Sequence, residues 1–310
     1  MTGADPVHAD HRLLEYGSDT AFVAGVMPFL SDGMRRAEPS LVVASARHLA
    51  MLQDLLGSDA GRRVRFADAT EWGSGNVPAR VLAVEWIIRK MVASAARCRY
   101  VGEFTWPAPA QRKEWCRHEA VANLLHKSSP LSMLCTVDTR ATSAEFLESL
   151  HHTHPIIAPD RPNPEFVEPL AYLARLDGAY RSAPPHADTS TAADELDLRP
   201  MRDRVSSDAR GAGLSDYQIQ SLALAATEVV ANVLHHAGTI ATIKTWTEES
   251  RFCCEISDKG PGISDPIAVY QPPAPAGGRC GLWLARTLSD ELVIASSDAG
   301  TTVLISYSRR

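Results

Sequence analysis

The first half of the chain alternates short apolar runs with longer amphipathic segments. Residues 40–46 form an apolar run that is typical of a buried strand, and an amphipathic stretch follows over residues 47–56. The same pattern predicts further strands over residues 63–67, 99–102 and 132–137, and helices over residues 77–96 and 111–126. Strands that alternate with helices indicate βαβ units and a parallel sheet. The first half is therefore predicted to be an α/β domain.

The second half has a different pattern, in which two helices precede most of the strands. Helices are predicted over residues 198–212 and 216–237, and the strand predicted over residues 252–257 alternates apolar and polar positions. A short helix and a hairpin come last, the helix over residues 282–288 and the hairpin strands over residues 292–296 and 301–307. This order indicates an α+β sandwich, with helices on one face of a mostly antiparallel sheet.

A polar segment separates the two patterns. Residues 177–196, which read DGAYRSAPPHADTSTAADEL, are rich in Ala, Ser, Thr, Asp and Pro and have no apolar periodicity. Such a composition is typical of a linker. The chain has 310 residues, and roughly 150 residues per domain predict about two domains. We therefore expect one domain over residues 8–176, a linker over residues 177–196 and a second domain over residues 197–310.

Composition and charge exclude several classes of protein. Apolar residues make up 45% and charged residues 22% of the chain, which is ordinary for a globular protein. The formal net charge of −6 and the lack of a long Lys/Arg run argue against direct binding to DNA. No apolar run reaches the ~18 residues of a membrane span, and residues 1–10 lack the apolar core of a signal peptide. We expect a cytoplasmic protein that contacts neither DNA nor a membrane.

The six cysteines are scattered without a CxxC pair, so in a reducing cytoplasm they are expected to be free thiols rather than disulfides. Cys116, His118 and Cys135 could together suggest a metal site. Their spacing matches no usual zinc pattern, so a zinc site is not expected from them.

Three polar residues share one face of the helix predicted over residues 216–237. Glu228, Asn232 and His236 are spaced i, i+4 and i+8, roughly opposite the apolar face. A carboxylate and an amide one turn apart can hold a metal-bound polyphosphate, and oxygen ligands of this kind suit Mg²⁺. A solvated helix face is the alternative interpretation.

Two glycine-rich segments follow the helix in the sequence. Asp258, directly after the strand of residues 252–257, could accept a hydrogen bond from an exocyclic amine, and Gly260 and Gly262 would let the backbone pass close to a flat ring. An ordinary turn is the alternative. The second segment has Gly278, Arg279, Gly281 and Leu282 at the start of the last helix, where amide groups can bind phosphate.

Two more features complete this set. Residues 271–276 (QPPAPA) could form a mobile lid. Thr302, on the closing hairpin, is either a fourth ligand or simply a strand residue.

In this order, the motifs resemble the Bergerat-fold (GHKL, HATPase_c) ATPases, which include gyrase and the histidine kinases. Glu228-x-x-x-Asn232 matches the N-box, Asp258-x-Gly260-x-Gly262 the first glycine box, and residues 278–282 the second. The short domain looks most like the anti-sigma-factor serine/threonine kinases of the RsbW type. The resemblance implies ATP and Mg²⁺ as cofactors, with Glu228 as general base, Asn232 on Mg²⁺ and Asp258 on adenine.

The second glycine box departs from the family pattern. It usually reads GxGL, and here Arg279 occupies the first glycine position. Arg279 could hinder the phosphate loop, or it could itself neutralise the γ-phosphate.

The first half resembles the MEDS domain, a sensory domain of methanogen and methylotroph proteins and of DcmR. The resemblance rests on scattered segments: residues 11–16, 75–80, 101–103, 106–107, 117–120, 134–138 and 153–155. It implies a RecA/KaiC-like α/β fold. Residues 44–48 (ASARH) stand where KaiC has its phosphate loop, and no GxxxxGK[ST] motif is present, so nucleotide hydrolysis is not expected in this half.

Five residues of the first half could line a sensor pocket: Glu103, Glu119, Cys135, Asp138 and His154. In the alternative interpretation, Glu119 and Asp138 are helix-surface or capping residues and Cys135 packs in the core.

A MEDS domain followed by an RsbW-like ATPase resembles the anti-sigma regulators of the RsbA type. This resemblance implies a protein that sequesters a sigma factor and phosphorylates a Ser or Thr of an anti-anti-sigma (STAS) partner, under control of an unknown signal sensed by the first half. It also makes a homodimer possible. One alternative is a non-catalytic ATPase fold that acts by stoichiometric contact. Another is a sensor histidine kinase, for which the linker offers only His186.

Overall fold

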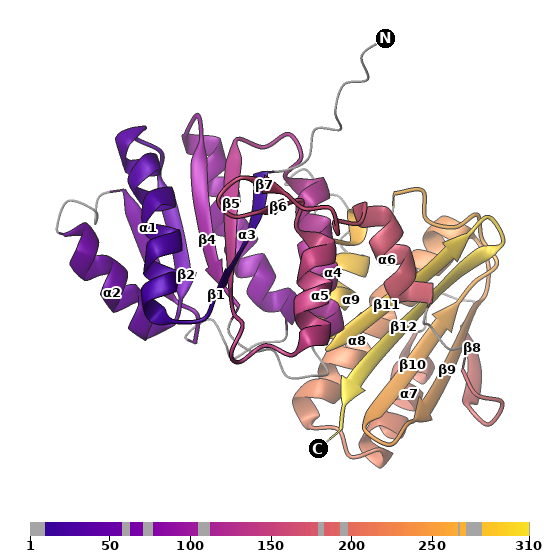
Figure 1. The fold of residues 1–310 in the computed structure, drawn as a ribbon. Helices are drawn as coiled ribbons and strands as arrows, with labels where there is room; N and C mark the ends of the chain where they lie inside the picture. The colour runs from indigo at the N-terminus through magenta and orange to yellow at the C-terminus, as the bar shows by residue number, and fades with distance from the viewer. Residues whose placement is uncertain are drawn as a thin grey trace, which may run out of the picture. The chain divides into compact units, whose positions relative to one another are not determined.

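The computed structural model describes residues 10–57, 63–70, 77–104, 112–178, 183–192, 198–265, 267–270 and 281–309. The chain divides into two compact units, the first comprising residues 1–75 and 80–173 and the second residues 76–79 and 174–310. Figure 1 shows the helices and strands of both units. In the described part of the chain, no helix is both long and apolar enough to cross a membrane.

The first unit contains a seven-stranded sheet with the order β3-β2-β4-β5-β1-β6-β7. Its neighbouring strands are parallel except for the antiparallel pair β6 and β7. The strands are β1 (Asp10–Tyr16), β2 (Ser40–Ala44), β3 (Val64–Asp68), β4 (Cys98–Glu103), β5 (Leu131–Asp138), β6 (Ile156–Ile157) and β7 (Arg161–Pro162). The parallel sheet confirms the predicted α/β architecture, whereas the RecA/KaiC-like assignment stays a prediction.

Helices alternate with these strands: α1 (Asp19–Arg35), α2 (Ala46–Leu56), α3 (Val77–Ser94), α4 (Arg112–Leu125), α5 (Ala144–Thr153) and α6 (Pro169–Gly178). The sheet packs on both faces, because side chains of successive strand residues point to opposite sides. In β2, Val42 belongs to a core with Phe22 and Leu30 of α1, while Leu41 belongs to a separate core with Ile88 of α3. This two-sided burial explains why β2 reads as a continuous apolar run.

The second unit contains a five-stranded sheet with the order β11-β12-β10-β9-β8, in which all neighbouring pairs are antiparallel. Its strands are β8 (Asp188–Ala192), β9 (Ala241–Thr247), β10 (Arg251–Ser257), β11 (Glu291–Ser297) and β12 (Gly300–Ser308). Its helices are α7 (Arg199–Gly211), α8 (Asp216–Asn232) and α9 (Gly281–Leu288). One core joins helix residues such as Leu222 and Ala285 to sheet residues such as Ile256 and Ile305. The predicted α+β sandwich is confirmed.

The predicted linker of residues 177–196 needs a correction, because it contains a strand. Residues Asp188–Ala192 form β8 and pair antiparallel with β9 at the edge of the second sheet. The strand is mostly exposed, so it lacks the apolar alternation by which a half-buried strand is recognised. Its alternating Thr and Ser residues suit the extended backbone of an edge strand.

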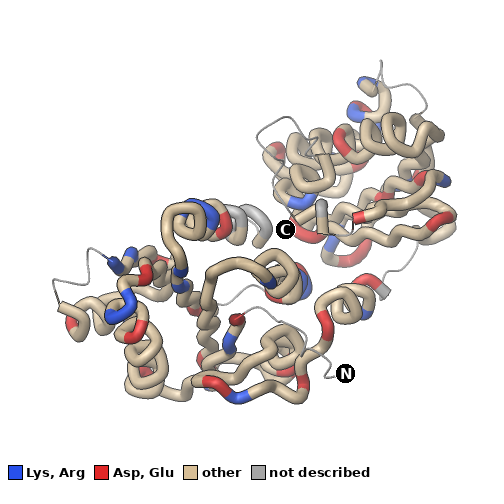
Figure 2. The backbone as a smooth tube through the Cα atoms, turned by 90° about the horizontal axis from the view of Figure 1, so that it is seen from above, with Lys and Arg blue, Asp and Glu red and all other residues tan. Residues whose placement is uncertain are grey.

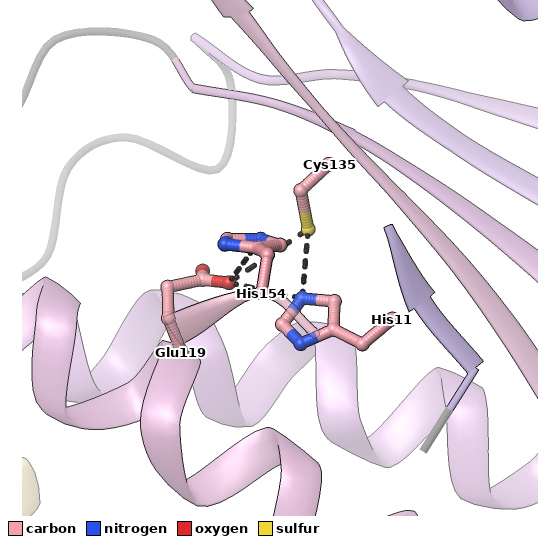
Figure 3. Close-up of side chains that lie close together, drawn as sticks. All are labelled: His11, Glu119, Cys135 and His154. Atoms are coloured by element: carbon pink, nitrogen blue, oxygen red, sulfur yellow. Dashed lines mark hydrogen bonds and ion pairs between the residues drawn. The ribbon is translucent and has the colours of Figure 1, made fainter. Parts of the chain in front are cut away.

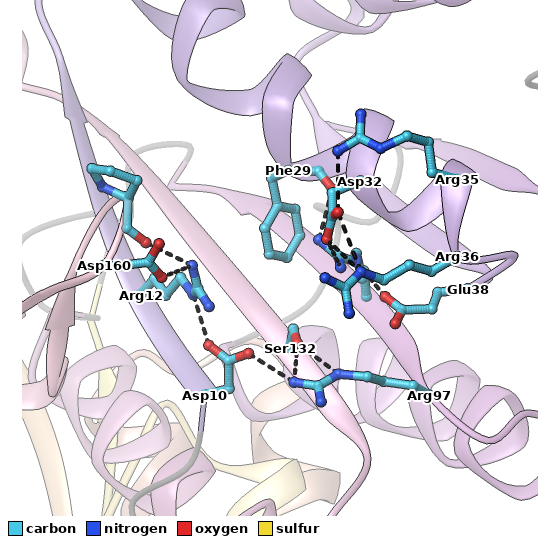
Figure 4. Close-up of polar contacts among 12 residues, drawn as sticks. Asp10, Arg12, Phe29, Asp32, Arg35, Arg36, Glu38, Arg97, Ser132 and Asp160 are labelled. Carbon is cyan, nitrogen blue, oxygen red and sulfur yellow. Dashed lines mark hydrogen bonds and ion pairs between the residues drawn. The ribbon is translucent and has the colours of Figure 1, made fainter.

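Charged residues of both signs are interspersed along the described backbone of each unit (Figure 2). In the first unit, the buried Arg99 links β4 to α1 and to Glu38, which follows α1 in the chain. Its Nε lies 2.6 Å from Glu38 Oε2, one terminal nitrogen lies 2.6 Å from Asp32 Oδ2, and the other donates to the Phe29 carbonyl at 2.8 Å. Figure 4 labels these three partners. The hydrogen bond from Arg99 lowers the pKa of Asp32.

Glu38 is as buried as Arg99, so its removal would leave a guanidinium short of a partner inside the unit. We predict that Glu38→Ala lowers the free energy of unfolding of the first unit by about 1–3 kcal/mol, because one buried donor of Arg99 loses its acceptor while Asp32 still balances the charge. Glu148→Ala, at an exposed position of α5, should change it by less than about 0.5 kcal/mol. Urea unfolding followed by circular dichroism measures both, and equal effects of the two substitutions would contradict the assigned role of the pair.

Candidate functional site

A cavity of about 360 Å³ opens in the second unit beside the end of α8, the segment after β10, β12 and the start of α9. Much of its wall is apolar, including Val229, Val233, Ile256, Ile263, Val269 and Val303. A few polar side chains interrupt that wall: Asn232, His236, Asp258, Ser264 and Thr301. An apolar cleft with a small number of placed polar groups is the usual form of a small-molecule site.

Asn232, the last residue of helix α8, lines this cavity. Ser215 caps the first turn of the helix, because the Ser215 side chain accepts from the Gln218 amide while the Gln218 side chain accepts from the Ser215 amide. The helix was predicted to run to residue 237, but its α-helical part ends at Asn232 and a π-helical turn follows over Val233–Ala237. Turns of this kind often occur at functional sites. Here the turn carries His236, which also lines the cavity.

Asp258 is held in the cavity wall by its own turn. Its amide donates to the Thr301 carbonyl at 2.9 Å, which continues the pairing of β10 with β12 by one residue. Its Oδ1 accepts from the Gly260 amide at 2.6 Å. The backbone therefore fixes the position of a half-buried carboxylate at the end of β10.

Two glycines allow close approaches at the cavity. Gly262 has a φ of +80°, and a Cβ there would lie 2.5 Å from the Ser297 carbonyl oxygen. A Cβ on Gly281 would lie 2.6 Å from Asn232 Nδ2. Gly281 is the first residue of α9, so the amide groups at the start of α9 lie beside the Asn232 side chain.

The structure places the other predicted residues as follows. Leu282 lines the cavity with Gly281 and Gly262. Gly260 is buried close to Ala237 and is not among the residues that line the cavity. Glu228 is half-buried on α8, one turn before Asn232, and is not among the residues that line the cavity. Gly278, Arg279 and the predicted lid of residues 271–276 lie outside the described residues.

The hairpin contributes Thr301 to the cavity instead of the predicted Thr302. Successive residues of a strand point to opposite faces, so a shift of one residue exchanges the face that a side chain joins. Trp283 was not among the predicted site residues. It lines the cavity, and its indole Nε1 is buried without a hydrogen-bond partner among the described residues. A buried donor of this kind could serve a ligand.

The five predicted sensor residues of the first unit separate into different groups. Glu103 lies at the carboxyl end of β4, where its carboxylate accepts from Tyr16 Oη at 2.8 Å and from the Ser45 amide at 2.7 Å, and lies 2.9 Å from His48 Nδ1. Burial, followed by the charge of Glu103, raises the pKa of Tyr16. Asp138 is paired instead with Arg140 at 2.6 Å, and these hydrogen bonds lower the pKa of Asp138.

Glu119, Cys135 and His154 do come together, and His11 joins them (Figure 3). The residues belong to α4, β5, the C-cap of α5 and β1 respectively. Their ligand atoms all lie within 4.8 Å of one another. His11 was quoted only as part of a family segment and was not predicted as a site residue, because nothing in its spacing links it to the other three.

Cys116 and His118 are not part of this cluster of described residues. Burial raises the pKa of the Cys116 thiol to about 12, and His118 Nε2 lies 3.4 Å from Glu114 Oε1.

A second cavity in the first unit, of about 610 Å³, is lined by charged residues. Arg12 lies 2.7 Å from Asp10 Oδ1 and 2.6 Å from Asp160 Oδ1, and Arg97 lies 3.2 Å from Asp10 Oδ2 (Figure 4). Four arginines and three aspartates are among the lining residues, and each of these arginines forms an ion pair with one of the aspartates.

Comparison with known families assigns a class to each half of the chain. Residues 10–155 match MEDS, the methanogen/methylotroph, DcmR sensory domain, and residues 191–307 match the histidine kinase-like ATPase domain. The chain thus carries a MEDS sensory domain followed by a histidine kinase-like ATPase domain, as the sequence motifs predicted. No curated protein matches the chain.

Two solved structures show a limited similarity. The RsbU and RsbW domains of Rv1364c from Mycobacterium tuberculosis align with 17% identity and a TM-score of 0.30, over 40% of this chain and 33% of that one. The histidine kinase domain of the Escherichia coli osmosensor EnvZ aligns with 14% identity and a TM-score of 0.25, over 42% of this chain and 93% of that one. The chain therefore spans about a third of the first structure. The domain assignment rests on the family matches, not on these alignments.

The contact between Gly281 and Asn232 can be tested by adding one methyl group. Gly281→Ala would force a Cβ into the Asn232 amide, so we predict a destabilisation of the second unit by about 1–3 kcal/mol. Gly211→Ala, at the end of α7 where a Cβ meets nothing within 4 Å, should be neutral or stabilising by up to about 1 kcal/mol. Thermal unfolding compares the two variants, and a neutral Gly281→Ala would show that the close approach is not required.

Proposed function

We propose that the second unit binds ATP with Mg²⁺. The observation that carries this proposal is the cavity in which apolar walls meet the Asn232 amide, the Asp258 carboxylate and the start of α9. In this proposal the purine lies between the apolar walls, and Asp258 accepts a hydrogen bond from its exocyclic amine. Asn232 holds Mg²⁺ through its amide oxygen. The phosphates lie near Gly281 and Leu282, where amide donors and the helix dipole favour anions.

The proposed reaction is phosphoryl transfer to a serine or threonine of an anti-anti-sigma (STAS) partner. The partner's hydroxyl oxygen forms a bond to the γ-phosphorus, the bond from that phosphorus to the bridging oxygen breaks, and ADP leaves. Glu228 accepts the hydroxyl proton. Since positioning and charge neutralisation supply most of the catalysis in such transfers, the residues that hold ATP and Mg²⁺ matter as much as the base.

The biological role proposed for this activity is a cytoplasmic switch. In one state the second unit sequesters a sigma factor, and phosphorylation of the STAS partner sets how much of the unit remains free to do so. The MEDS unit biases this switch in response to its signal, and its parallel sheet suits the proposed RecA/KaiC-like fold. The proposal involves no direct contact with DNA, and homodimerisation of the second unit is part of it.

A second candidate is a regulator that binds ATP, or only its partner, without catalysis. The position of Glu228 favours it, because this residue is not among those lining the cavity. Incubation with γ-labelled ATP and a STAS partner separates the two proposals. Label on the partner supports the kinase, whereas sigma binding without label supports the stoichiometric regulator.

The histidine kinase alternative gains no support from His186. A phosphoacceptor histidine belongs on a dimerising helical hairpin, whereas His186 lies in a turn directly before β8.

The adenine assignment can be tested by removing one carboxylate. We predict that Asp258→Ala weakens ATP–Mg²⁺ binding by at least about 100-fold, because a charged acceptor fixed by the backbone is lost from the cavity. Asp298→Ala, in the exposed turn between β11 and β12, should bind as the unaltered protein does. Isothermal titration calorimetry measures both, and normal binding by Asp258→Ala would show that the adenine assignment is wrong.

The proposed role of Glu228 as the base can be tested separately from the binding of ATP. Glu228→Gln keeps the size of the side chain but cannot accept the proton, so we predict ATP binding within about twofold of the unaltered protein and a loss of transfer of at least about 100-fold. Gln220→Ala, at an exposed position of the same helix, should retain both. Transfer that survives in Glu228→Gln would remove Glu228 from the mechanism.

A further inference from the structure

We propose that His11, Glu119, Cys135 and His154 bind one divalent transition-metal ion of the zinc class in the first unit. The four side chains converge from segments that are far apart in the sequence (Figure 3). His11 and Cys135 lie on neighbouring parallel strands, where Leu13 pairs with Cys135, and Glu119 and His154 approach from α4 and the end of α5. This site is independent of the proposed nucleotide site.

Four of the six distances between the donor atoms are close to those around a tetrahedral ion, and all six are within 4.8 Å. With metal–nitrogen and metal–oxygen bonds near 2.0 Å and a metal–sulfur bond near 2.3 Å, neighbouring donors in a tetrahedron lie about 3.3–3.5 Å apart. His11 Nε2 lies 3.3 Å from both Cys135 Sγ and Glu119 Oε2. His154 Nε2 lies 3.5 Å from Glu119 Oε2, and Cys135 Sγ lies 3.7 Å from the same oxygen. Small movements would bring all four atoms onto one ion.

The surrounding residues orient His154 for metal binding. His154 is fully buried, and its Nδ1 lies 2.7 Å from the Leu150 carbonyl oxygen, which can only accept. The proton therefore resides on Nδ1, and Nε2 presents a lone pair to the cluster. This Nε2 has no hydrogen-bond partner among the described residues. A buried acceptor without a donor is costly, and a metal ion would satisfy it.

His11 is oriented in the same way by Asn123. The Asn123 Nδ2 donates to the carbonyl oxygens of Thr153 at 2.8 Å and Glu119 at 3.0 Å. Its Oδ1 therefore faces His11 Nδ1 at 3.2 Å and accepts the proton of that nitrogen. Both imidazoles thus direct bare Nε2 atoms inward. A metal-binding histidine normally makes such a hydrogen bond through its other nitrogen.

The atoms that face one another in the cluster offer more lone pairs than there are protons to bind them. Two imidazole nitrogens, a carboxylate oxygen and a sulfur face one another, and the thiol supplies a single proton. One divalent cation can accept an electron pair from all four atoms, and the thiol proton is released to solvent when it binds.

The chemical types of the four donor atoms indicate which class of metal ion the site would bind. Mg²⁺ and Ca²⁺ prefer oxygen ligands, whereas imidazole and thiolate suit zinc and its neighbours in the first transition row. Four protein ligands complete a tetrahedron, which is typical of structural or regulatory zinc rather than catalytic zinc. Because the ligands come from β1, β5, α4 and the end of α5, an ion at this site would link elements from both ends of the MEDS domain.

Cobalt provides a direct probe of the proposed coordination. The full chain, without a histidine tag, is stripped with a chelator and titrated with Co²⁺. We expect one equivalent to produce a thiolate-to-cobalt charge-transfer band together with the intense visible bands of a tetrahedral site. Zn²⁺ should then displace the Co²⁺ and abolish both features. A titration without the charge-transfer band would contradict the proposal and leave a simple ion pair between His11 and Glu119.

Variants assign the binding to these residues. Cys135→Ser should lose the charge-transfer band and weaken Zn²⁺ binding, measured by competition with a chromophoric chelator. Cys98→Ser makes the same change at a buried cysteine of β4 outside the cluster, and should leave both unchanged. Asn123→Ala should weaken Zn²⁺ binding by about 10–100-fold while the band remains, because only the orientation of His11 is loosened.

Circular dichroism of each variant shows whether it folds. If Cys135→Ser does not fold, Glu119→Gln, at the least buried of the four positions, replaces it in the competition experiment with the same expected loss of affinity. Zn²⁺ binding that is unchanged in a folded Cys135→Ser or Glu119→Gln would overturn the site.

Discussion

The close approach of the Asn232 side chain to the backbone of Gly281 is the constraint on which the cavity of the second unit depends. It brings the end of α8 against the start of α9 with no space for a side chain between them. The π-helical turn after Asn232 then directs His236 into the same cavity. The Asp258 turn and Gly262 form the facing part of the wall, where β10 gives way to a backbone that passes close to Ser297. An amide, a carboxylate and a helix start are thereby held around a largely apolar space.

The polar residues of the two units differ in their surroundings and in what they bind. In the second unit, a few polar groups line an open cavity and are available to a ligand. In the first unit, the polar residues of two largely buried groups, one around Glu103 and one around Arg99, are bound to one another within each group. The cluster of His11, Glu119, Cys135 and His154 is the exception that we interpret as a metal site, because its acceptors outnumber its donors.

Much of the fold could be predicted from the sequence, because the spacing of apolar residues indicates which segments form strands and helices. The two-sided burial of β2 gives a continuous apolar run. In β10, Phe252, Cys254 and Ile256 pack in the core as their spacing predicted, whereas Cys253 and Glu255 on the opposite face are buried as well. Strand β8 was missed because an exposed edge strand carries no apolar pattern. The change from α-helix to π-helix after Asn232 was missed because helical periodicity does not distinguish the two over a single turn.

The sites were less predictable than the fold, and for a different reason. Asp258 and Gly262 could be found because they are close together in a motif, whereas the choice between Thr301 and Thr302 depends on a register that the sequence does not state. His11 could not be linked to Cys135 without knowing that β1 and β5 are neighbours in the sheet. Trp283 lacks a motif of its own, and it is noticed only because its indole nitrogen is buried without a hydrogen-bond partner in the described part of the chain.

Hydrogen exchange of the full chain with and without ATP–Mg²⁺ tests the central claim most directly, because it locates the nucleotide as well as detecting it. The account predicts slower exchange on ligand binding at three segments that border the cavity: residues 229–237, residues 256–264 and the start of α9. Protection confined to the first unit, or no change at these three segments at a saturating concentration of ATP–Mg²⁺, would contradict it.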